Sequence, residues 1–452
     1  MNTYKAYPEY KDSGVEWLGE IPEHWKFSQV KYGYSITLGK MLQKEKNSYF
    51  DSFEPYLKAQ NIQVSGLDLH TVDSMWFSRE EKKKLLLEYN DILVSEGGDV
   101  GRSALWLGQM NQCYIQNAIN RVRPKKNNSA TFFQYWITFL KSTDFINIIC
   151  NKATIAHYTV EKLASSPLLL PKKNEQQQIA DFLDHETAKI DNLIDKQQQL
   201  IELLKEKRQA VISHAVTKGL HPDVPMKDSG VEWLGKVPQH WSTLRLKYIF
   251  RIKKCIAGKT GYDVLSVTQK GIKIKDITNN EGQLSMDYSK YQRVLPGDFA
   301  MNHMDLLTGY IDISSFDGVT SPDYRVFFII NNEAFYSYYF LYLLQNGYHQ
   351  KLFFHLGQGS AHLGRWRLPT EAFNEILYPC PILEEQIKIV DFLRMHTTKI
   401  DTLIEKQLQQ IALLQERRTA LISAAVTGKI DVRHWRAPNE HSETIAEAEV
   451  AV

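Results

Sequence analysis

The chain has 452 residues, of which 43% are hydrophobic and 23% charged, and its formal net charge is +2. This length allows two or three domains with cores of their own, and the composition excludes a chain that is mostly disordered. The near-neutral charge excludes a uniformly basic nucleic-acid binder, so any such role must depend on local patches. No apolar run approaches the ~20 residues of a membrane span, and the N-terminal letters lack a signal-peptide core. We therefore expect a cytoplasmic protein with no membrane partner.

Two further features of composition limit the chemistry. Basic residues cluster locally at Lys82–Lys84, at Arg121–Lys126, at 251–254 and at 270–275, although each cluster alone is more simply a solvated charged face. The cysteines are far apart, with no CxxC pair and no histidine at ligand spacing: Cys113, Cys150, Cys255 and Cys380. We expect reduced thiols and no metal site in this chain.

The first distinctive element is the peptide KDSGVEWLGEIPEHW, from Lys11 to Trp25, which returns as KDSGVEWLGKVPQHW from Lys227 to Trp241. An identical start in two places indicates an internal duplication. The tryptophans suit a strap whose rings pack against helix ends and contact a partner protein: Trp17, Trp25, Trp233 and Trp241. A second interpretation remains equally open, namely that the strap only completes a core.

A variable segment follows each strap. Residues 26–170 and 242–380 mix short apolar runs, such as DILVSEGG from Asp91, with aromatic-rich helical stretches, such as TFFQYWITFL from Thr131. These patterns predict two compact, mixed α/β domains. Their sequences diverge although their positions correspond. The repeated segments around them therefore form a constant frame, and the two domains are its variable parts.

A long helical pattern follows each variable segment. KIDNLIDKQQQLIELLKEKRQAVISHAVT begins at Lys189, and KIDTLIEKQLQQIALLQERRTALISAAVT begins at Lys399, an offset of 210 residues. Apolar residues recur with heptad spacing, and the register is the same in both copies because the offset is a multiple of seven. The first helix, expected over Glu175–Val216, would be about 60 Å long at ~1.5 Å per residue, and a stripe of that length needs a partner. We predict that the two helices pair antiparallel, giving an internal pseudo-twofold repeat that suits double-stranded DNA with two half-sites.

This layout resembles the specificity subunit of type I restriction-modification systems over about Lys11 to Lys429. The resemblance is carried by LPKKNEQQQIADFLD (170–184), CPILEEQIKIVDFLR (380–394), YLKAQNIQ (56–63), NDILVSEGGDVGR (90–102) and ATIAHYTVEKLASSPLLLP (153–171). The second variable segment fits less well, because GSAHLGRWRLPTEAFNEILYPCP (359–381) replaces the usual Thr-Ile-x-His turn. The predicted divisions are 1–170 (strap and first target-recognition domain), 171–218 (first spacer helix), 219–380 (strap and second domain), 381–428 (second helix) and a disordered tail, 429–452.

The resemblance implies a subunit without catalytic chemistry of its own. In that family each target-recognition domain reads one half of a bipartite, asymmetric DNA site, and the paired helices set the spacing and dock two methyltransferase subunits. Restriction subunits join them, and S-adenosylmethionine, ATP and Mg²⁺ are expected on those partners and not on this chain. We therefore expect no catalytic residue in this chain.

Side chains able to read bases or contact phosphate occur in loops of both variable domains. The candidates are Lys58, Gln60, Asn61, Arg102, His157 and Tyr158 in the first domain, and Lys270, Arg325, His362 and Arg365 in the second.

Other functions are less well supported by the sequence. An adenine methyltransferase would show an Asn-Pro-Pro-aromatic motif and a glycine-rich cofactor loop, and neither occurs. GVEWLGKV (230–237) departs from a phosphate-binding loop at Val237, where a hydroxyl should ligand Mg²⁺. The alternatives left open are a coiled-coil adaptor without sequence-specific DNA binding and a specificity subunit that serves a fused restriction-methylation enzyme.

Overall fold

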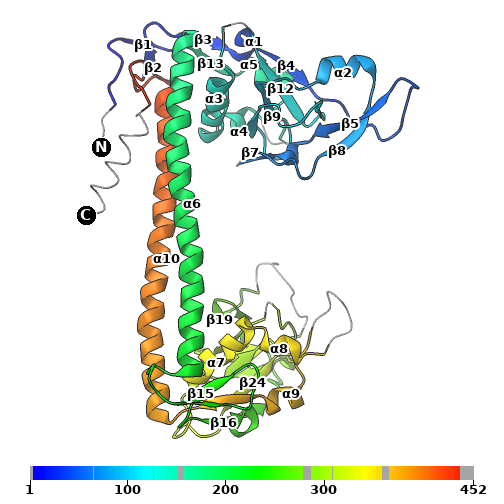
Figure 1. The fold of residues 1–452 in the computed structure, drawn as a ribbon. Coiled ribbons are helices and arrows are strands. Elements are labelled where there is room, and N and C mark those ends of the chain that lie inside the picture. Colours follow the sequence, from blue (N-terminus) through cyan, green and yellow to red (C-terminus); the bar gives the residue numbers. More distant parts are fainter. Residues whose placement is uncertain are drawn as a thin grey trace. The chain divides into compact units, whose positions relative to one another are not determined.

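The computed structural model describes residues 4–64, 66–125, 127–150, 156–277, 287–307, 309–358 and 366–437. The chain divides into two compact units, residues 1–197 with 409–452, and residues 198–408. Each unit contains one α/β globule and part of each of two long helices, α6 (Lys173–Lys218) and α10 (Leu383–Val426). Figure 1 shows the elements in chain order. The mixed α/β class and the two long helices are confirmed.

The first globule is built on a four-stranded antiparallel sheet in the order β10-β9-β12-β4, beside a three-stranded sheet in the order β11-β5-β8. All five residues of β9 are buried, as its apolar run predicts. The strands are β4 (Tyr34–Leu38), β5 (Ser52–Leu57), β8 (Asp73–Phe77), β9 (Asp91–Ser95), β10 (Ser103–Trp106), β11 (Tyr114–Ile115) and β12 (Ile119–Pro124). Short pieces complete the globule: β6 (Ile62–Gln63), β7 (Gly66–Leu67), η1 (Ala59–Asn61), α1 (Val30–Gly33), α2 (Arg79–Leu85), α4 (Phe145–Ile149) and α5 (Val160–Ser165).

One helix, α3 (Ala130–Ser142), supplies most of the aromatic packing of this globule. It begins at Ser129, whose side chain accepts a hydrogen bond from the Phe132 backbone N–H and caps the first turn. Its apolar face buries Phe132, Phe133 and Trp136 in the core that also contains residues of α6 and α10. The globule is closed by β3 (Lys26–Gln29), which pairs with β13 (Pro167–Leu170) and so brings the start and end of the domain together.

The second globule repeats the main sheet. Its order β22-β21-β24-β17 matches β10-β9-β12-β4 strand for strand, and β16 (Ser242–Arg245) pairs with β25 (Leu377–Cys380) as β3 pairs with β13. The second sheet differs, because β19 and β20 extend it on opposite edges in the order β19-β18-β23-β20. The remaining bounds are β17 (Phe250–Lys253), β18 (Asp263–Thr268), β19 (Gly271–Ile274), β20 (Gln292–Val294), β21 (Phe299–Met301), β22 (Ile311–Ile313), β23 (Gly318–Thr320), β24 (Arg325–Ile329), η2 (Leu246–Tyr248), η3 (Tyr288–Lys290), α7 (Ser337–His349), α8 (Leu352–His355) and α9 (Thr370–Glu375).

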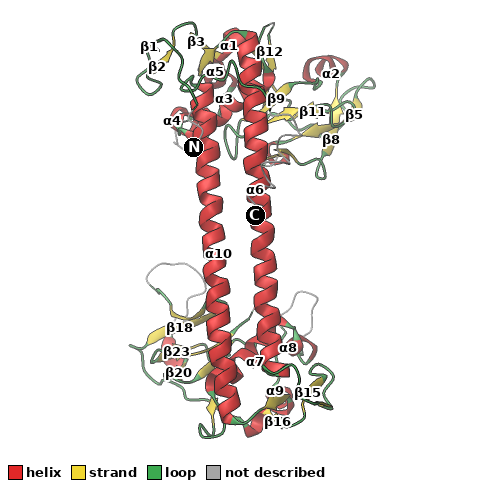
Figure 2. Cartoon of the chain, turned by 60° about the vertical axis from the view of Figure 1, so that its left-hand side comes forward, coloured by secondary structure: helices red, strands yellow, loops and turns green. Residues whose placement is uncertain are grey.

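The long helices pair antiparallel in each unit, as predicted, and Figure 2 shows them side by side. In the first unit the Arg418 guanidinium bonds Asp191, with Nε to Oδ1 at 2.8 Å. In the second unit Arg208 bonds Asp401 at the same distance. Both helices are followed by a glycine with positive φ, 79° at Gly219 and 74° at Gly428, a backbone conformation that ends a helix at low cost. Helix α6 begins two residues before and ends two residues after the expected Glu175–Val216, within the ordinary uncertainty of helix ends.

The expected disordered tail from 429 is wrong for residues 429–437. Val432 is buried and Trp435 packs against the first core, where its ring meets Phe182 and His185. Residues 438–452, the rest of that predicted segment, lie outside the described residues.

Candidate nucleic-acid interface

In the first globule, the turn between β9 and β10 brings most of the predicted DNA contacts together. Lys58, Gln60 and Asn61 lie on or beside η1, and the Arg102 guanidinium donates to the Ala59 carbonyl of that turn at 3.4 Å. On its other side, the turn contacts residues 157–158, because the Tyr158 N–H donates to the Glu96 carbonyl at 2.8 Å. All six predicted contacts of this globule thus lie on or around one turn of the variable domain.

Two of these predicted contacts are buried, and burial corrects their role. The Asn61 side chain is fully buried, where its oxygen accepts from the Lys58 N–H and its amide donates to the Asp68 carbonyl and Thr71 Oγ1. The Tyr158 ring is also fully buried, and its hydroxyl is hydrogen-bonded to Ser166 at 2.7 Å. Both side chains shape the loops and are inaccessible to DNA in this conformation.

The four remaining candidates of this globule are accessible to different degrees. Gln60 and His157 are exposed, whereas Lys58 is paired with Asp73 at 2.5 Å and Arg102 lies near Asp99 at 3.6 Å. Glu96 faces His157, and burial raises the pKa of its carboxyl, partly offset by the His157 charge.

In the second globule only one of the four candidates is an exposed side chain of the described residues. Lys270 lies on the turn between β18 and β19, and Thr268 Oγ1 accepts from its N–H. Arg325 is buried over the Phe373 ring and donates to the Leu368 carbonyl at 2.8 Å, so it is structural and not a DNA contact. Burial lowers the pKa of its guanidinium to about 10. His362 and Arg365 lie outside the described residues.

The basic cluster at Arg121–Lys126 is also largely structural. Arg123 bonds both carboxylate oxygens of Asp91, at 2.6 and 2.7 Å, and Arg121 donates to the Leu86 carbonyl at 2.8 Å. The Asp91 bonds join β12 to the start of β9, and the Leu86 bond joins β12 to the end of α2. The neighbouring Lys126 lies outside the described residues.

The repeated peptide builds the same turn twice. Asp12 Oδ1 accepts from the Gly14 N–H at 2.9 Å, and Asp228 accepts from the Gly230 N–H at the same distance. Each turn closes a hairpin, β1 (Tyr10–Asp12) with β2 (Glu20–Pro22), and β14 (Met226–Asp228) with β15 (Lys236–Pro238). Identical letters are therefore explained by identical backbone geometry, with the aspartate closing the turn in each copy.

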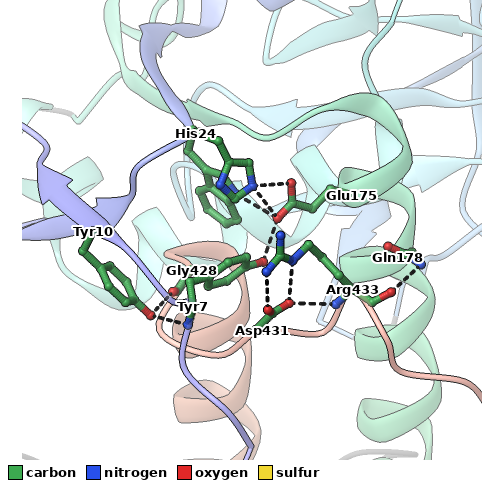
Figure 3. Close-up of polar contacts among 9 residues, drawn as sticks. Tyr7, Tyr10, His24, Glu175, Gln178, Gly428, Asp431 and Arg433 are labelled. Atoms are coloured by element: carbon green, nitrogen blue, oxygen red, sulfur yellow. Dashed lines mark hydrogen bonds and ion pairs between the residues drawn. The ribbon is translucent and has the colours of Figure 1, made fainter.

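Each strap is attached to the start of a long helix by a glutamate, as Figure 3 shows for the first copy. Glu175 is buried and accepts from the Tyr7 hydroxyl at 2.8 Å and Trp25 Nε1 at 3.0 Å, and its other oxygen lies 2.9 Å from His24 Nε2. Burial, reinforced by Glu175, raises the pKa of Tyr7 well above its ordinary value, which keeps the hydroxyl a donor. In the second copy Glu385 meets His240 at 2.9 Å, whereas the Trp241 Nε1 is buried without a hydrogen-bond partner among the described residues.

The next residue of each helix attaches the globule. Gln176 accepts from the Ser129 N–H, just before α3, and donates to the Pro171 carbonyl. Gln386 accepts from the Tyr336 N–H, just before α7, and donates to the Pro381 carbonyl. The Glu-Gln pair of each helix start therefore fixes a strap with one side chain and a variable domain with the next. The sequence shows the Glu-Gln pair in both copies, but not that the glutamate binds the strap and the glutamine binds the variable domain.

The four strap tryptophans differ in accessibility. Trp25 and Trp241 are buried, so they complete cores and cannot contact a partner directly. Trp17 is 42% exposed with its ring 5.3 Å from that of Phe145, and Trp233 is half-buried with its ring 5.5 Å from that of Tyr378. The docking prediction therefore stays open for Trp17 and Trp233 alone.

Within the described ranges, no group of three or more His, Cys, Asp or Glu side chains is arranged to hold a metal ion. Among the same residues, no helix is both long and apolar enough to cross a membrane.

Two globules with the same main-sheet order, each attached to an equivalent strap and helix start, define a class of protein in which a constant frame presents two variable surfaces. The family model described as the type I restriction modification DNA specificity domain matches residues 22–203 and 238–413. The chain therefore belongs to this family and is a type I specificity subunit.

Curated relatives and a solved structure agree with this assignment. The chain is 23% identical to the MjaVIII specificity subunit of Methanocaldococcus jannaschii, over 92% of this chain and 95% of that protein. It is 24% identical to the StySPI specificity subunit of Salmonella potsdam, over 93% and 92%. A chain from a structural study of type I complex assembly and conformational transition has the same fold, with a TM-score of 0.65 at 10% identity over 90% of this chain and 98% of that one.

Proposed function

We propose that this chain reads a bipartite, asymmetric site on double-stranded DNA, with one half-site recognised by each globule. The observation that carries the proposal is the combination of one repeated main sheet with different loops on it. The repeated main sheet supports an equivalent reading surface on each globule, whereas the divergent loops allow each surface to select different bases. The half-buried Arg102 beside the exposed Gln60 represents the kind of donor pair that such reading needs.

The long helices set the distance between the half-sites and dock two methyltransferase subunits, with restriction subunits joining the complex. Support comes from the straps, because the two turns are equal in sequence and in hydrogen bonding and can present the same surface twice to one kind of partner. The chain contributes no catalytic residue. S-adenosylmethionine, ATP and Mg²⁺ bind to the partner subunits, and the complex works in the cytoplasm.

Mapping methylated adenines in cells with and without this gene tests the proposal. Loss of one bipartite motif on deletion is the expected result. Exchanging residues 242–380 for those of another family member should then change one half of the motif and leave the other half unchanged. An unaltered methylome in cells that express the chain and its partners would contradict the proposal and favour an adaptor without sequence preference.

A further inference from the structure

The connection between β4 and β5, residues 39–51, presents two adjacent aromatic rings to solvent. Tyr49 is 88% exposed and Phe50 is 81% exposed, and their ring centroids lie 5.7 Å apart at 85°. In Figure 1 this connection projects from the first globule near α2 and β5. Single exposed apolar residues are common, but two neighbouring rings that pack on so little of their own domain indicate a contact surface.

The loop that carries these rings is held from within. Asp51 is buried, and one of its oxygens accepts from the Asn47 and Ser48 backbone N–H groups, each at 3.1 Å. Gln43 adds a second attachment, because its carbonyl accepts from the Trp76 N–H at 3.2 Å. The exposed rings therefore lie on an ordered turn. Binding of a ligand to these rings would not require the whole loop to become ordered first, which lowers the entropic cost of binding.

Aromatic and basic groups continue from the tip onto the neighbouring sheet. Phe53 is 56% exposed and its ring lies 5.2 Å from that of Trp76. The Lys46 ammonium lies between the two pairs, 5.1 Å from the Trp76 ring and 5.4 Å from the Tyr49 ring. We call the tip, Tyr49 and Phe50 with Lys44 and Lys46, the aromatic wedge.

The charge around the aromatic wedge is positive. Exposed cations without an ion pair among the described residues are Lys44, Lys46, Arg79, Lys83 and Lys84, against exposed carboxylates at Glu45 and Glu80. The α2 residues belong to the same region, because Lys84 and Leu42 line one cleft. A polyanion with flat apolar groups fits this surface, and duplex DNA presents both once a base step is opened.

The second globule has no pair of exposed, adjacent aromatic rings in the matching connection, residues 254–262, all of which the structure describes. Its aromatic residue, Tyr262, is half-buried beneath Arg293, whose guanidinium carbon lies 3.6 Å from the ring centroid. The wedge is therefore a property of one variable domain and not of the shared frame.

We infer that the aromatic wedge inserts a ring into a base step of the DNA held by the first globule and unstacks it, while Lys44 and Lys46 contact the flanking phosphates. This inference rests on the proposed function and adds a specific deforming element to it. Opening a step makes recognition sensitive to the stacking energy of that step, so the loop contributes selectivity without reading a base edge.

The test uses the full chain with the methyltransferase subunits that copurify with it, and duplexes with 2-aminopurine placed at successive positions through the mapped motif. Wild-type protein should raise the fluorescence at one step of the half-site read by the first globule. Tyr49→Ala with Phe50→Ala should abolish that rise and weaken binding roughly tenfold, since the stacking of a base on an aromatic ring would be lost. Tyr49→Phe with Phe50→Tyr should retain both signals.

Tyr32→Ala is the matched control, because Tyr32 is 67% exposed and Lys31 Nζ lies 5.1 Å from its ring, yet it lies on α1, outside the wedge. The control should behave as wild type. Unchanged fluorescence and affinity in the double alanine variant would overturn the inference, as would lost binding of the methyltransferase subunits with the DNA signals intact, which would make the surface a protein dock. A wild-type complex without sequence preference would instead refute the proposed function itself.

Discussion

Arg418 and Asp191 make the same two-pronged contact as Arg208 and Asp401. In each pair the guanidinium Nε lies 2.8 Å from one carboxylate oxygen and a terminal nitrogen lies 3.3 Å from the other. Each pair joins an α6 residue to an α10 residue inside one unit. The duplication is therefore preserved in side-chain geometry at the helix pair, even where the globules differ.

We predict that the two ion pairs have equal, modest coupling energies. Their side chains are about a third to a half exposed, so solvent limits each pair to about 0.5–1 kcal/mol. A double-mutant cycle with Asp191→Ala and Arg418→Ala, followed by urea unfolding, measures the first pair, and the cycle with Arg208→Ala and Asp401→Ala measures the second. Coupling should decline in high salt. Zero coupling in one pair and not in the other would contradict the equivalence.

The strap tryptophans should respond differently to the same substitution. Trp25→Phe removes a donor to the buried Glu175 carboxylate, whereas Trp241→Phe removes an indole N–H that has no partner among the described residues. Both changes remove similar ring volume, so Trp25→Phe should cost about 1.5 kcal/mol more, the typical value of a hydrogen bond to a charged group. Hydrogen exchange at the starts of α6 and α10 reports each site separately. Equal losses of protection would show that the Glu175 bond contributes nothing.

His303 should make the second unit sensitive to acid. Burial lowers the pKa of His303 to about 3, with Arg325 and Arg367 adding to the effect, from an ordinary value of 6.5. The unfolded chain therefore takes up a proton first as the pH falls, so stability is complete above about 6.5 and declines toward 3. At pH 5 the expected loss is about 2 kcal/mol. Urea unfolding between pH 7 and 5 should show this loss in wild type and a smaller one in His303→Gln, and parallel pH profiles would refute the prediction.

Gln60 and Asn61 are adjacent in sequence but should have opposite mutant phenotypes. Asn61→Ala removes buried bonds to Lys58, Asp68 and Thr71, so it should destabilise the first globule by about 2 kcal/mol. Gln60→Ala alters an exposed side chain, so stability should change by less than about 0.5 kcal/mol. If Gln60 contacts a base, DNA affinity should fall by about 1–3 kcal/mol. Unfolding and DNA-binding titrations of the two variants separate these effects, and wild-type affinity in Gln60→Ala would remove it from the interface.

Burial explains why only some of the residues predicted to contact DNA are accessible to it. The sequence shows that Asn61, Tyr158 and Arg325 carry hydrogen-bonding groups in the variable domains, but not whether those groups face the backbone or solvent. All three are buried and bonded within their domains. The exposed pair Tyr49 and Phe50 was missed for the converse reason, since aromatic letters ordinarily predict core. Two adjacent aromatics after Lys44 and Lys46 were the available signal.

The sequence by itself determined the duplication, the two long helices, their antiparallel pairing and the mixed α/β class. These properties follow from repeats and hydrophobic periodicity, which can be recognised in the sequence without knowing which distant residues are in contact. Only the tertiary structure decided that the Glu-Gln pairs divide strap from globule, that Trp25 and Trp241 are interior, and that residues 429–437 pack on the first core. Those outcomes depend on which distant groups share a buried space, and pairing between residues 47 to 168 positions apart leaves no periodic trace in the sequence.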